Sequence, residues 1–314
     1  MQLSKNKNKN NMQAKRIKSD MWQVYLLGAI PLLLIFIFSY IPMFGIIIGF
    51  KDYRYDLGIF GSKWIGFKNF EVFLKSRDFV TITRNTLVMN SIFIACGIIA
   101  AVLVAILLYE LTSRKATKVY QTILITPHFL SWVVVASMAY AFLHPSNGLL
   151  NSLVVKLGGE PVDWYAAPGA WPFILTIASV WKSVGMDSVI YYASLMGIDH
   201  SLYEAAELDG ATRFQKNLYV TLPHLVSLIV MLTILKIGGI FRADFGLFYQ
   251  LTRDSGALYE ATDVMDTYIF RTMRVVGDYG LSTAMGLIQS VVGMIMVLIT
   301  NHVANRIDPD TALF

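Results

Sequence analysis

Three charged side chains are prominent inside long apolar stretches of the sequence. Lys182 and Asp187 interrupt the run 171–197, and Lys236 interrupts the run 218–243. A charge within a membrane span is costly and is by default a functional candidate, because it must face a polar cavity or a partner rather than lipid. The pattern therefore indicates recognition of a polar solute or an ion inside the membrane.

Beyond these charges, the sequence holds little that would support covalent chemistry. It contains no Gly-x-x-x-x-Gly-Lys-Ser/Thr phosphate loop, so the chain cannot be an ATPase. Cys96 is the only cysteine, which excludes a disulfide within the chain and a metal site built on thiolates. His128 and His224 each follow a proline without a Cys, Asp or Glu at ligand spacing, so we expect helix-kink histidines. We predict a non-catalytic chain without cofactor or metal.

The apolar runs that carry the charges have the length and composition of membrane spans. Hydrophobic residues make up 55% of the 314 residues and charged residues only 15%, whereas soluble domains carry about 25% charged residues. A helix needs about 20 apolar residues to cross a bilayer. The sequence therefore predicts an all-α integral membrane protein with six transmembrane helices, within residues 21–304, at 22–50, 86–109, 119–143, 171–197, 218–243 and 280–303.

The N-terminal tail, residues 1–20, sets the expected orientation. It is rich in Asn and Lys and reads as a disordered arm that contacts anionic lipid. Basic residues favour the cytoplasmic side, and six spans then bring the C-terminal tail, 305–314, to the same side. The expected internal loops are 110–118 and 198–217, and the expected external segments are 51–83, 144–170 and 244–279.

A polar segment, residues 198–223, lies between the fourth and fifth spans. Ser201 and Glu204 have the spacing of a capping box, which predicts a short helix starting there. Gly210 permits a sharp turn, and Pro223 disturbs the helix that follows. We expect two short helices at an angle on the cytoplasmic face.

The same segment resembles the EAA motif of the permease subunits of ABC importers. The matching residues are Glu204, Ala205, Ala206, Asp209, Gly210, Ala211, Leu222 and Pro223. The resemblance implies that the first short helix docks on a separate ATPase subunit and transmits its movement. It also implies two ATPase subunits that hold ATP and Mg²⁺, a second and different permease, an extracellular solute-binding protein, and a place in the bacterial cytoplasmic membrane. No feature indicates nucleic acid.

Other stretches resemble carbohydrate permeases of the maltose type. They are Gly148 to Asn151, Trp181 to Asp187, Phe245 to Thr252, Thr262 to Tyr268 and Asp278 to Gly280. The last three look like the LplB/YteP-like subgroup, which imports complex oligosaccharides, and like related alginate permeases. The resemblance thus implies an oligosaccharide as cargo.

In maltose-type permeases, sugar contacts come from the fourth and fifth spans. The positions that correspond here, with the neighbouring charged and aromatic residues, are Ser179, Lys182, Ser183, Met186, Asp187, Lys236, Ile240, Phe241, Arg242 and Ala243 or Asp244. The cationic residues among them predict an acidic, uronate-containing oligosaccharide. The alternative is a neutral sugar, with Lys182 paired to Asp187 and Lys236 paired to a carboxylate of the partner subunit or to backbone carbonyls.

Two further alternatives concern the class of transporter. The chain could be an ABC permease for another solute class. It could also be an ion-coupled secondary transporter in which Lys182 and Asp187 are the coupling charges, since such proteins place ionisable residues near the bilayer midplane. Finally, Asp254, Glu260, Asp263 and Asp266 make the last external segment acidic, and we expect them in a solvated loop that meets the binding protein or shapes the outer gate.

Overall fold

The computed structural model describes residues 21–22 and 25–307 and has the predicted all-α architecture. Five helical segments are long and apolar enough to cross a membrane: Tyr25–Phe50, Arg77–Tyr109, Pro168–Leu195, Arg213–Gly238 and Tyr279–Arg306. A sixth candidate consists of two helices, Arg114–Phe129 and Trp132–Leu143, which meet at an angle of 98°. The chain is thus a multi-pass membrane protein.

The elements follow one another along the chain with short connections. The part before the second span contains η1 (Phe36–Tyr40), α2 (Ile41–Met43), η2 (Phe44–Phe50), β1 (Lys51–Asp52), α3 (Gly58–Gly61), β2 (Lys63–Trp64) and α4 (Lys68–Leu74). The middle contains α5 (Arg77–Tyr109), α6 (Arg114–Ile125), η3 (Thr126–Phe129), α7 (Trp132–Leu143), α8 (Leu149–Lys156), η4 (Trp164–Ala166), η5 (Pro168–Ala170) and α9 (Trp171–Leu195). The remainder contains α10 (His200–Leu208), α11 (Arg213–Lys216), η6 (Asn217–Thr221), α12 (Leu222–Gly238), α13 (Phe245–Leu251), η7 (Gly256–Leu258), α14 (Tyr259–Thr262), α15 (Met265–Arg271), η8 (Thr272–Val276) and α16 (Tyr279–Ile307).

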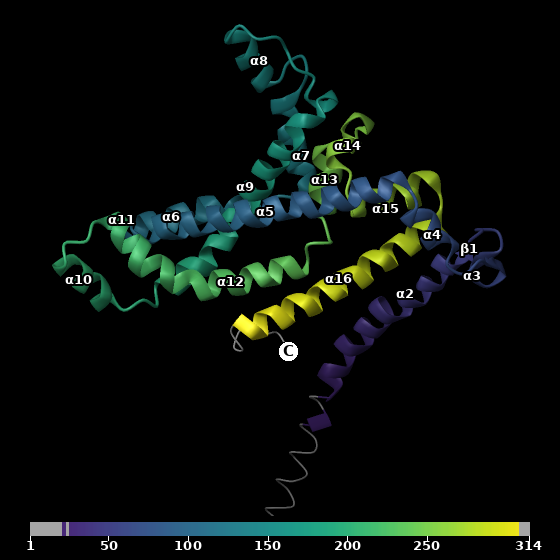
Figure 1. Cartoon of the computed structure of the whole chain (residues 1–314), viewed down its shortest axis with the longest axis horizontal. Coiled ribbons are helices and arrows are strands. Elements are labelled where there is room, and N and C mark those ends of the chain that lie inside the picture. The colour runs from purple at the N-terminus through teal and green to yellow at the C-terminus, as the bar shows by residue number, and fades with distance from the viewer. Residues whose placement is uncertain (1–20, 23–24, 308–314) are drawn as a thin grey trace, which may run out of the picture.

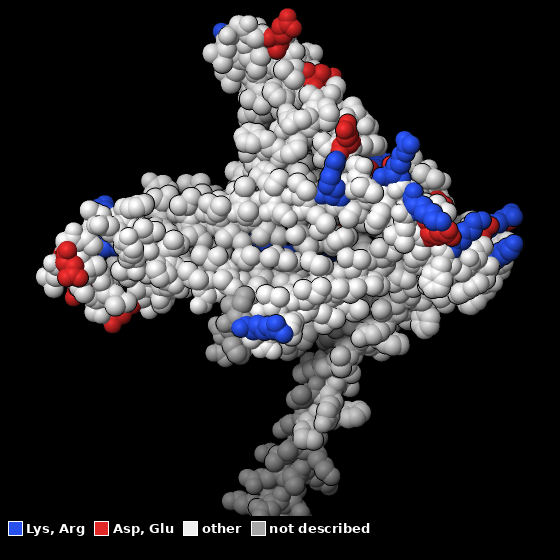
Figure 2. Space-filling model, viewed as in Figure 1, with Lys and Arg blue, Asp and Glu red and all other residues white. Residues whose placement is uncertain are grey.

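The long helices lie between two polar ends (Figure 1). Helices α10 and α11 form one end of the long axis, and β1, α3 and α4 form the other. Lys, Arg, Asp and Glu gather at these ends and at the tip that carries α8, whereas the surface over the long helices is almost free of them (Figure 2). An uncharged belt between charged ends is the surface that a bilayer-spanning protein requires.

The third span, predicted at 119–143, is bent near its middle. The chain turns between Phe129 and Trp132, close to Pro127, which cannot donate a backbone hydrogen bond. Helix α7 restarts with Ser131 as its N-cap, whose hydroxyl accepts from the amide of Val134 at 3.4 Å. The kink predicted near His128 is therefore confirmed, and the third span consists of two helices that meet at this bend.

Helix α5 is longer than the predicted second span, 86–109. It begins at Arg77, because the hydroxyl of Ser76 accepts from the amide of Phe79 at 3.1 Å and caps the helix there. Its first turns therefore lie within the segment 51–83 that we expected to be an external connection. The polar caps, rather than the first apolar residue, determine where this helix starts.

Close packing of α9 against α6 explains one glycine of the Trp-x-x-x-Gly pattern. A Cβ atom at Gly185 would lie 1.9 Å from the backbone oxygen of Leu124. Only glycine permits this approach, which brings the middle of the fourth span against the third span just before its bend.

Candidate functional site

The polar segment between α9 and α12 forms a hairpin of the two short helices α10 and α11. The N-cap of α10 is Asp199, whose carboxylate accepts from the amide of Ser201 at 3.0 Å. The predicted Ser201–Glu204 capping box is therefore wrong, because Asp199 caps the helix two residues earlier. A capping box does occur at α11, between Thr212 and Gln215.

Gly210 makes the turn between the two helices, as predicted. Its φ is +76°, a conformation that glycine adopts without the penalty of a side chain. The amide of Gly210 donates to the carbonyl of Glu207 at 3.0 Å, and the amide of Ala211 donates to that of Ala206 at 2.9 Å. This pair of bonds is a Schellman motif, which terminates α10 and fixes the direction of α11.

Three polar contacts hold the hairpin together and tie it to the long helices. Lys216 pairs with Glu207 at 2.5 Å, and the hydroxyls of Tyr203 and Thr221 lie 2.9 Å apart. The side-chain amide of Asn217 also donates to the carboxylate of Glu110, at the end of α5, at 2.5 Å. Sequence reasoning missed these contacts, because nothing in the spacing of the motif marks residues outside it as partners.

The outer face of the hairpin is exposed. The matched residues Glu204, Ala205, Asp209 and Gly210 are exposed, and Ala206 and Ala211 are half-buried. Leu208 is 90% exposed. Pro223 stands at the start of α12, after the widened turn η6. An exposed apolar side chain beside a carboxylate on a short, well-capped helix is suited to contact with another protein.

The charges inside the spans pair differently from the prediction. Lys236 of α12 pairs with Asp187 of α9, with Nζ and Oδ2 2.6 Å apart, whereas Lys182 donates to the backbone oxygen of His128 at 2.8 Å. Lys182 and Asp187 are five residues apart, which places them about 140° apart around the helix axis. The alternative in which Lys182 pairs with Asp187 is therefore wrong, because Asp187 pairs with Lys236 of this same chain.

Lys182 lies where the bend of the third span meets the segment that follows α12. Its ammonium lies 5.2 Å from the ring centroid of Trp132, and the Trp132 indole donates to the carboxylate of Asp244 at 2.7 Å. Gly246 packs so closely that a Cβ atom there would lie 2.3 Å from Trp132. Lys182 and Asp244 are thus neighbours of one tryptophan, although they are far apart in the sequence.

The fifth span ends at Gly238, and other helices satisfy the backbone groups released there. Asn90 of α5 donates to the carbonyl oxygens of Ile240 at 2.7 Å and Arg242 at 3.1 Å. Gln289 of α16 donates to that of Phe241 at 2.9 Å. Such partners are required where a helix breaks at membrane depth.

The remaining residues of the predicted path have different surroundings in this chain. Ser179 and Ser183 are half-buried on α9, and Met186 is 46% exposed. Phe241 packs with Phe73 and Met285 rather than beside Lys182. Phe241 and Arg242 line a separate cavity of about 370 Å³ against α16.

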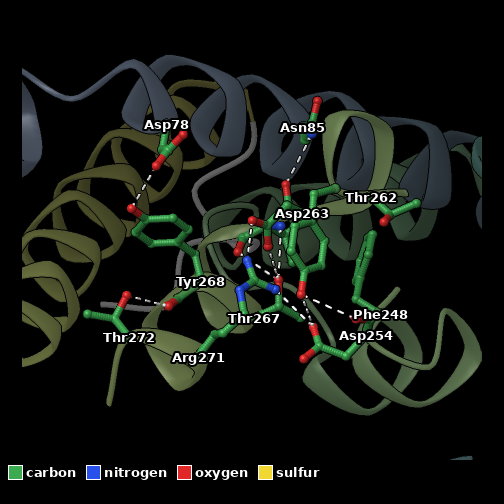
Figure 3. A network of polar contacts seen from close by, with 12 residues as sticks. Asp78, Asn85, Phe248, Asp254, Thr262, Asp263, Thr267, Tyr268, Arg271 and Thr272 are labelled. Atoms are coloured by element: carbon green, nitrogen blue, oxygen red, sulfur yellow. Dashed lines mark hydrogen bonds and ion pairs between the residues drawn. The ribbon is translucent and has the colours of Figure 1, made fainter. Parts of the chain in front are cut away.

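The acidic segment after α13 is a buried network rather than a solvated loop (Figure 3). Arg271 pairs with Asp254 at 2.9 Å and also with Asp263, which is 7% exposed. Burial raises the pKa of the Asp263 carboxyl, and the Arg271 charge opposes that shift. Asp266 accepts from the amide of Ala243 at 2.8 Å.

The prediction of a solvated loop is therefore wrong for Asp254, Asp263 and Asp266. A single arginine pairs with the first two carboxylates, and the backbone amide of Ala243 and the side-chain amide of Gln289 donate to the third. Within residues 21–22 and 25–307, no group of three His, Cys, Asp or Glu side chains is arranged to hold a metal ion.

The fold and these sites define a multi-pass membrane protein with a polar hairpin at one end and paired charges between its spans. Residues 94–309 match the family model of the binding-protein-dependent transport system inner membrane component. The chain belongs to this family of transport components, which confirms the predicted class and excludes the ion-coupled secondary transporter.

Curated relatives cover nearly the whole chain. Protein LplB of Bacillus subtilis (strain 168) is 35% identical over 294 residues, which are 94% of this chain and 92% of LplB. The polygalacturonan/rhamnogalacturonan transport system permease protein YteP of the same organism is 35% identical over 270 residues, or 86% of this chain and 84% of YteP.

Solved structures show the same fold. A chain from the crystal structure of a bacterial ABC transporter involved in import of the acidic polysaccharide alginate has a TM-score of 0.83 and 34% identity, and the match covers 94% of this chain and 98% of that chain. A second chain, from the bacterial alginate ABC transporter in complex with alginate pentasaccharide-bound periplasmic protein, has a TM-score of 0.81 and 33% identity over 93% of this chain and 97% of that chain. The predicted carbohydrate-permease subgroup is thereby confirmed.

Proposed function

We propose that this chain is the permease subunit of an ABC importer that takes up acidic oligosaccharides delivered by an extracellular solute-binding protein. It does not hydrolyse ATP, and it lies in the bacterial cytoplasmic membrane with both termini in the cytoplasm. A second, different permease completes the pathway, and two ATPase subunits hold ATP and Mg²⁺.

The observation that carries the proposed cargo is the Lys236–Asp187 pair between α12 and α9, with 36% and 25% of the two side chains exposed. A partly exposed pair can exchange its carboxylate for that of a ligand, because a charge-assisted hydrogen bond is kept throughout. Two relatives support this chemistry, since their names specify polygalacturonan/rhamnogalacturonan and the acidic polysaccharide alginate.

The exposed face of α10 supports a mechanical role for the hairpin. Glu204 and Ala205 are exposed on α10 and are therefore accessible to a docked protein. When the ATPases close on ATP, the hairpin moves as one unit through its links to α5 and α12, because Asn217 and Tyr203 connect it to both. The spans then open outward to the loaded binding protein, and hydrolysis returns the inward-facing state.

Uptake by the complete transporter in proteoliposomes tests the cargo. The probes are trigalacturonate and its carboxyl-reduced, neutral counterpart. The combined change Lys236→Gln and Asp187→Asn removes both charges without leaving one unpaired. We expect the preference for the acidic probe to fall at least ten-fold, since a hydrogen bond to a charged group contributes about 1.5–3 kcal/mol.

The matched control is the exposed pair on α4, changed by Lys75→Gln and Glu71→Gln, which should keep the preference. An unchanged preference in the Lys236→Gln/Asp187→Asn variant would show that this pair is only structural. Equal uptake of both probes by the wild-type transporter would refute an acidic cargo altogether.

A further inference from the structure

A second polar cavity lies between α7 and α13, apart from the Lys236–Asp187 pair. Its volume is about 530 Å³. It is lined by apolar and hydroxyl-bearing residues of α7, by two residues of α13, and by the turn after α13: Val133, Ala136, Ser137, Tyr140, Tyr249, Gln250, Arg253 and Asp254. No residue of this lining belongs to the solute path predicted from the sequence.

Arg253 is the basic residue in the lining of this cavity, and it forms no ion pair with a carboxylate in the part of the chain that the structure describes. Its guanidinium lies over the ring of Tyr140, 4.0 Å from the centroid. Within the part of the chain that the structure describes, no carboxylate lies within 4.0 Å of it, and the adjacent Asp254 is engaged by Arg271 at 2.9 Å. The side chain is exposed, so its positive charge is available to a ligand.

The backbone at this turn is strained in a way that directs Arg253 into the cavity. Arg253 has φ +55° and Asp254 has φ +49°, and the left-handed conformation is unfavourable for a residue with a side chain. Successive side chains thereby reach in two directions, Arg253 to Tyr140 and Asp254 to Arg271. Strain that the surrounding structure maintains is characteristic of functional positions.

The neighbouring contacts keep the turn in place. The hydroxyl of Ser255 donates to the backbone oxygen of Tyr165 at 3.0 Å, and the Tyr165 ring lies 5.6 Å from that of Tyr140. Tyr249 packs against Phe245 and Phe270, at centroid distances of 4.9 and 5.1 Å. The cavity is therefore preorganised, which lowers the entropic cost of binding a ligand.

The lining has the chemistry of a binding site for an acidic sugar. Tyr140 and Tyr249 offer rigid aromatic surface with a polar hydroxyl. Gln250 and Ser137 donate and accept hydrogen bonds, as sugar hydroxyls require. A guanidinium binds a carboxylate in a bidentate manner, which a hydroxyl cannot match.

The cavity also adjoins the solute path. Val133 follows Trp132, whose indole contacts Asp244 and lies beneath Lys182. We propose that the cavity is an outer subsite that binds one uronate unit of the oligosaccharide, with Arg253 pairing with its carboxylate. The inference rests on the proposed function. It adds Arg253 to Lys236 as a second cationic binding residue, on the outer side of the bend in the third span.

The test measures uptake of trigalacturonate and its carboxyl-reduced counterpart by the complete transporter carrying Arg253→Gln, Arg253→Lys or the control Arg274→Gln. Arg274 is an exposed arginine of the same external segment. We expect Arg253→Gln to lower uptake of the acidic probe about ten-fold at subsaturating concentration, Arg253→Lys to restore part of it, and uptake of the neutral probe to stay within two-fold.

A second measurement does not depend on transport. In a Cys96→Ser background, alkylation of Arg253→Cys in the assembled transporter should be slowed by trigalacturonate and not by the neutral probe. Alkylation that neither probe slows, together with uptake by Arg253→Gln equal to that by Arg274→Gln, overturns the subsite.

The remaining outcomes separate this inference from the proposed function. Loss of acidic preference in the Lys236→Gln/Asp187→Asn variant but not in Arg253→Gln leaves the proposed function standing and refutes the subsite. Equal loss of both probes in Arg253→Gln, with weaker docking of the binding protein, refutes the subsite and assigns the surface to protein contact. Wild-type transporter that takes up no trigalacturonate refutes both.

Discussion

The two ends of this molecule are held by different kinds of contact. In the hairpin of α10 and α11, the caps and the ion pair join residues close in sequence, such as Asp199 with Ser201 and Glu207 with Lys216. At the outer end, the amide of Met265 donates to the hydroxyl of Thr86 at 3.0 Å across 179 positions. Asn85 similarly donates to the backbone oxygen of Asp263 at 3.1 Å.

The difference matches the work that each end does. The hairpin is exposed and internally complete, so it can shift as a unit without breaking its own bonds. The outer network is buried and joins α5, α14 and α15, so any movement within it would leave charges unpaired. Under the proposed function, the hairpin is the mobile, inner end that receives force, and the network around Arg271 is a fixed outer frame that supports the solute path.

The largest effect should come from Arg271→Met in the outer frame. It leaves Asp254 and the buried Asp263 without their cation, and breaking a buried ion pair from one side costs about 3–5 kcal/mol. We expect a large fall in the thermal unfolding temperature of the purified transporter. The control Arg274→Met removes an exposed arginine and should unfold like the wild type. Equal losses in both variants would contradict a special role for the network.

The next effect concerns the end of the fifth span. Asn90→Leu leaves the carbonyl oxygens of Ile240 and Arg242 without their donor, at a cost of about 1–3 kcal/mol. Unfolding in denaturant should reveal this loss. Ser91→Ala is the comparison, because the Ser91 hydroxyl bonds only within its own helix. If Asn90→Leu were as stable as Ser91→Ala, the carbonyls would not depend on Asn90.

At the mobile end, Gly210→Ala should affect coupling more than stability. The φ of +76° is unfavourable for alanine by about 1–2 kcal/mol, and the strain falls on a turn outside the spans. We expect uptake stimulated by the loaded binding protein to drop several-fold while the unfolding temperature changes little. Gly169→Ala, at a position with open space and no positive φ, serves as the control. Normal uptake in Gly210→Ala would argue against transmission through this turn.

The smallest expected effect is a change in the pKa of Glu207, on the surface of the hairpin. The Lys216 ammonium lowers the pKa of the Glu207 carboxyl. Because the folded-state pKa is the lower one, the pair stabilises the hairpin at pH above the unfolded value and loses this contribution as pH falls through the folded value. In Lys216→Met, NMR titration of Glu207 should show a higher pKa than in the wild type. An unchanged pKa would mean that the pair does not form in solution.

The sequence predicted those parts of the structure that depend on local chemistry. The turn at Gly210 and the kink near His128 follow from glycine and proline, whose backbone preferences act within a few residues. The partners of Lys182, Lys236 and Asp263 could not be predicted from the sequence, because the rotation and depth of the helices that carry them depend on packing of the whole bundle. Even a family resemblance gave positions for the solute path without showing which of them share a cavity.

One measurement tests the central claim most directly: ATP-dependent uptake of labelled trigalacturonate by the complete transporter in proteoliposomes. We predict that uptake requires ATP and the loaded binding protein. We also predict that the carboxyl-reduced trisaccharide competes with this uptake only weakly. Uptake driven by an ion gradient without ATP, or equal competition by the neutral trisaccharide, would contradict the account.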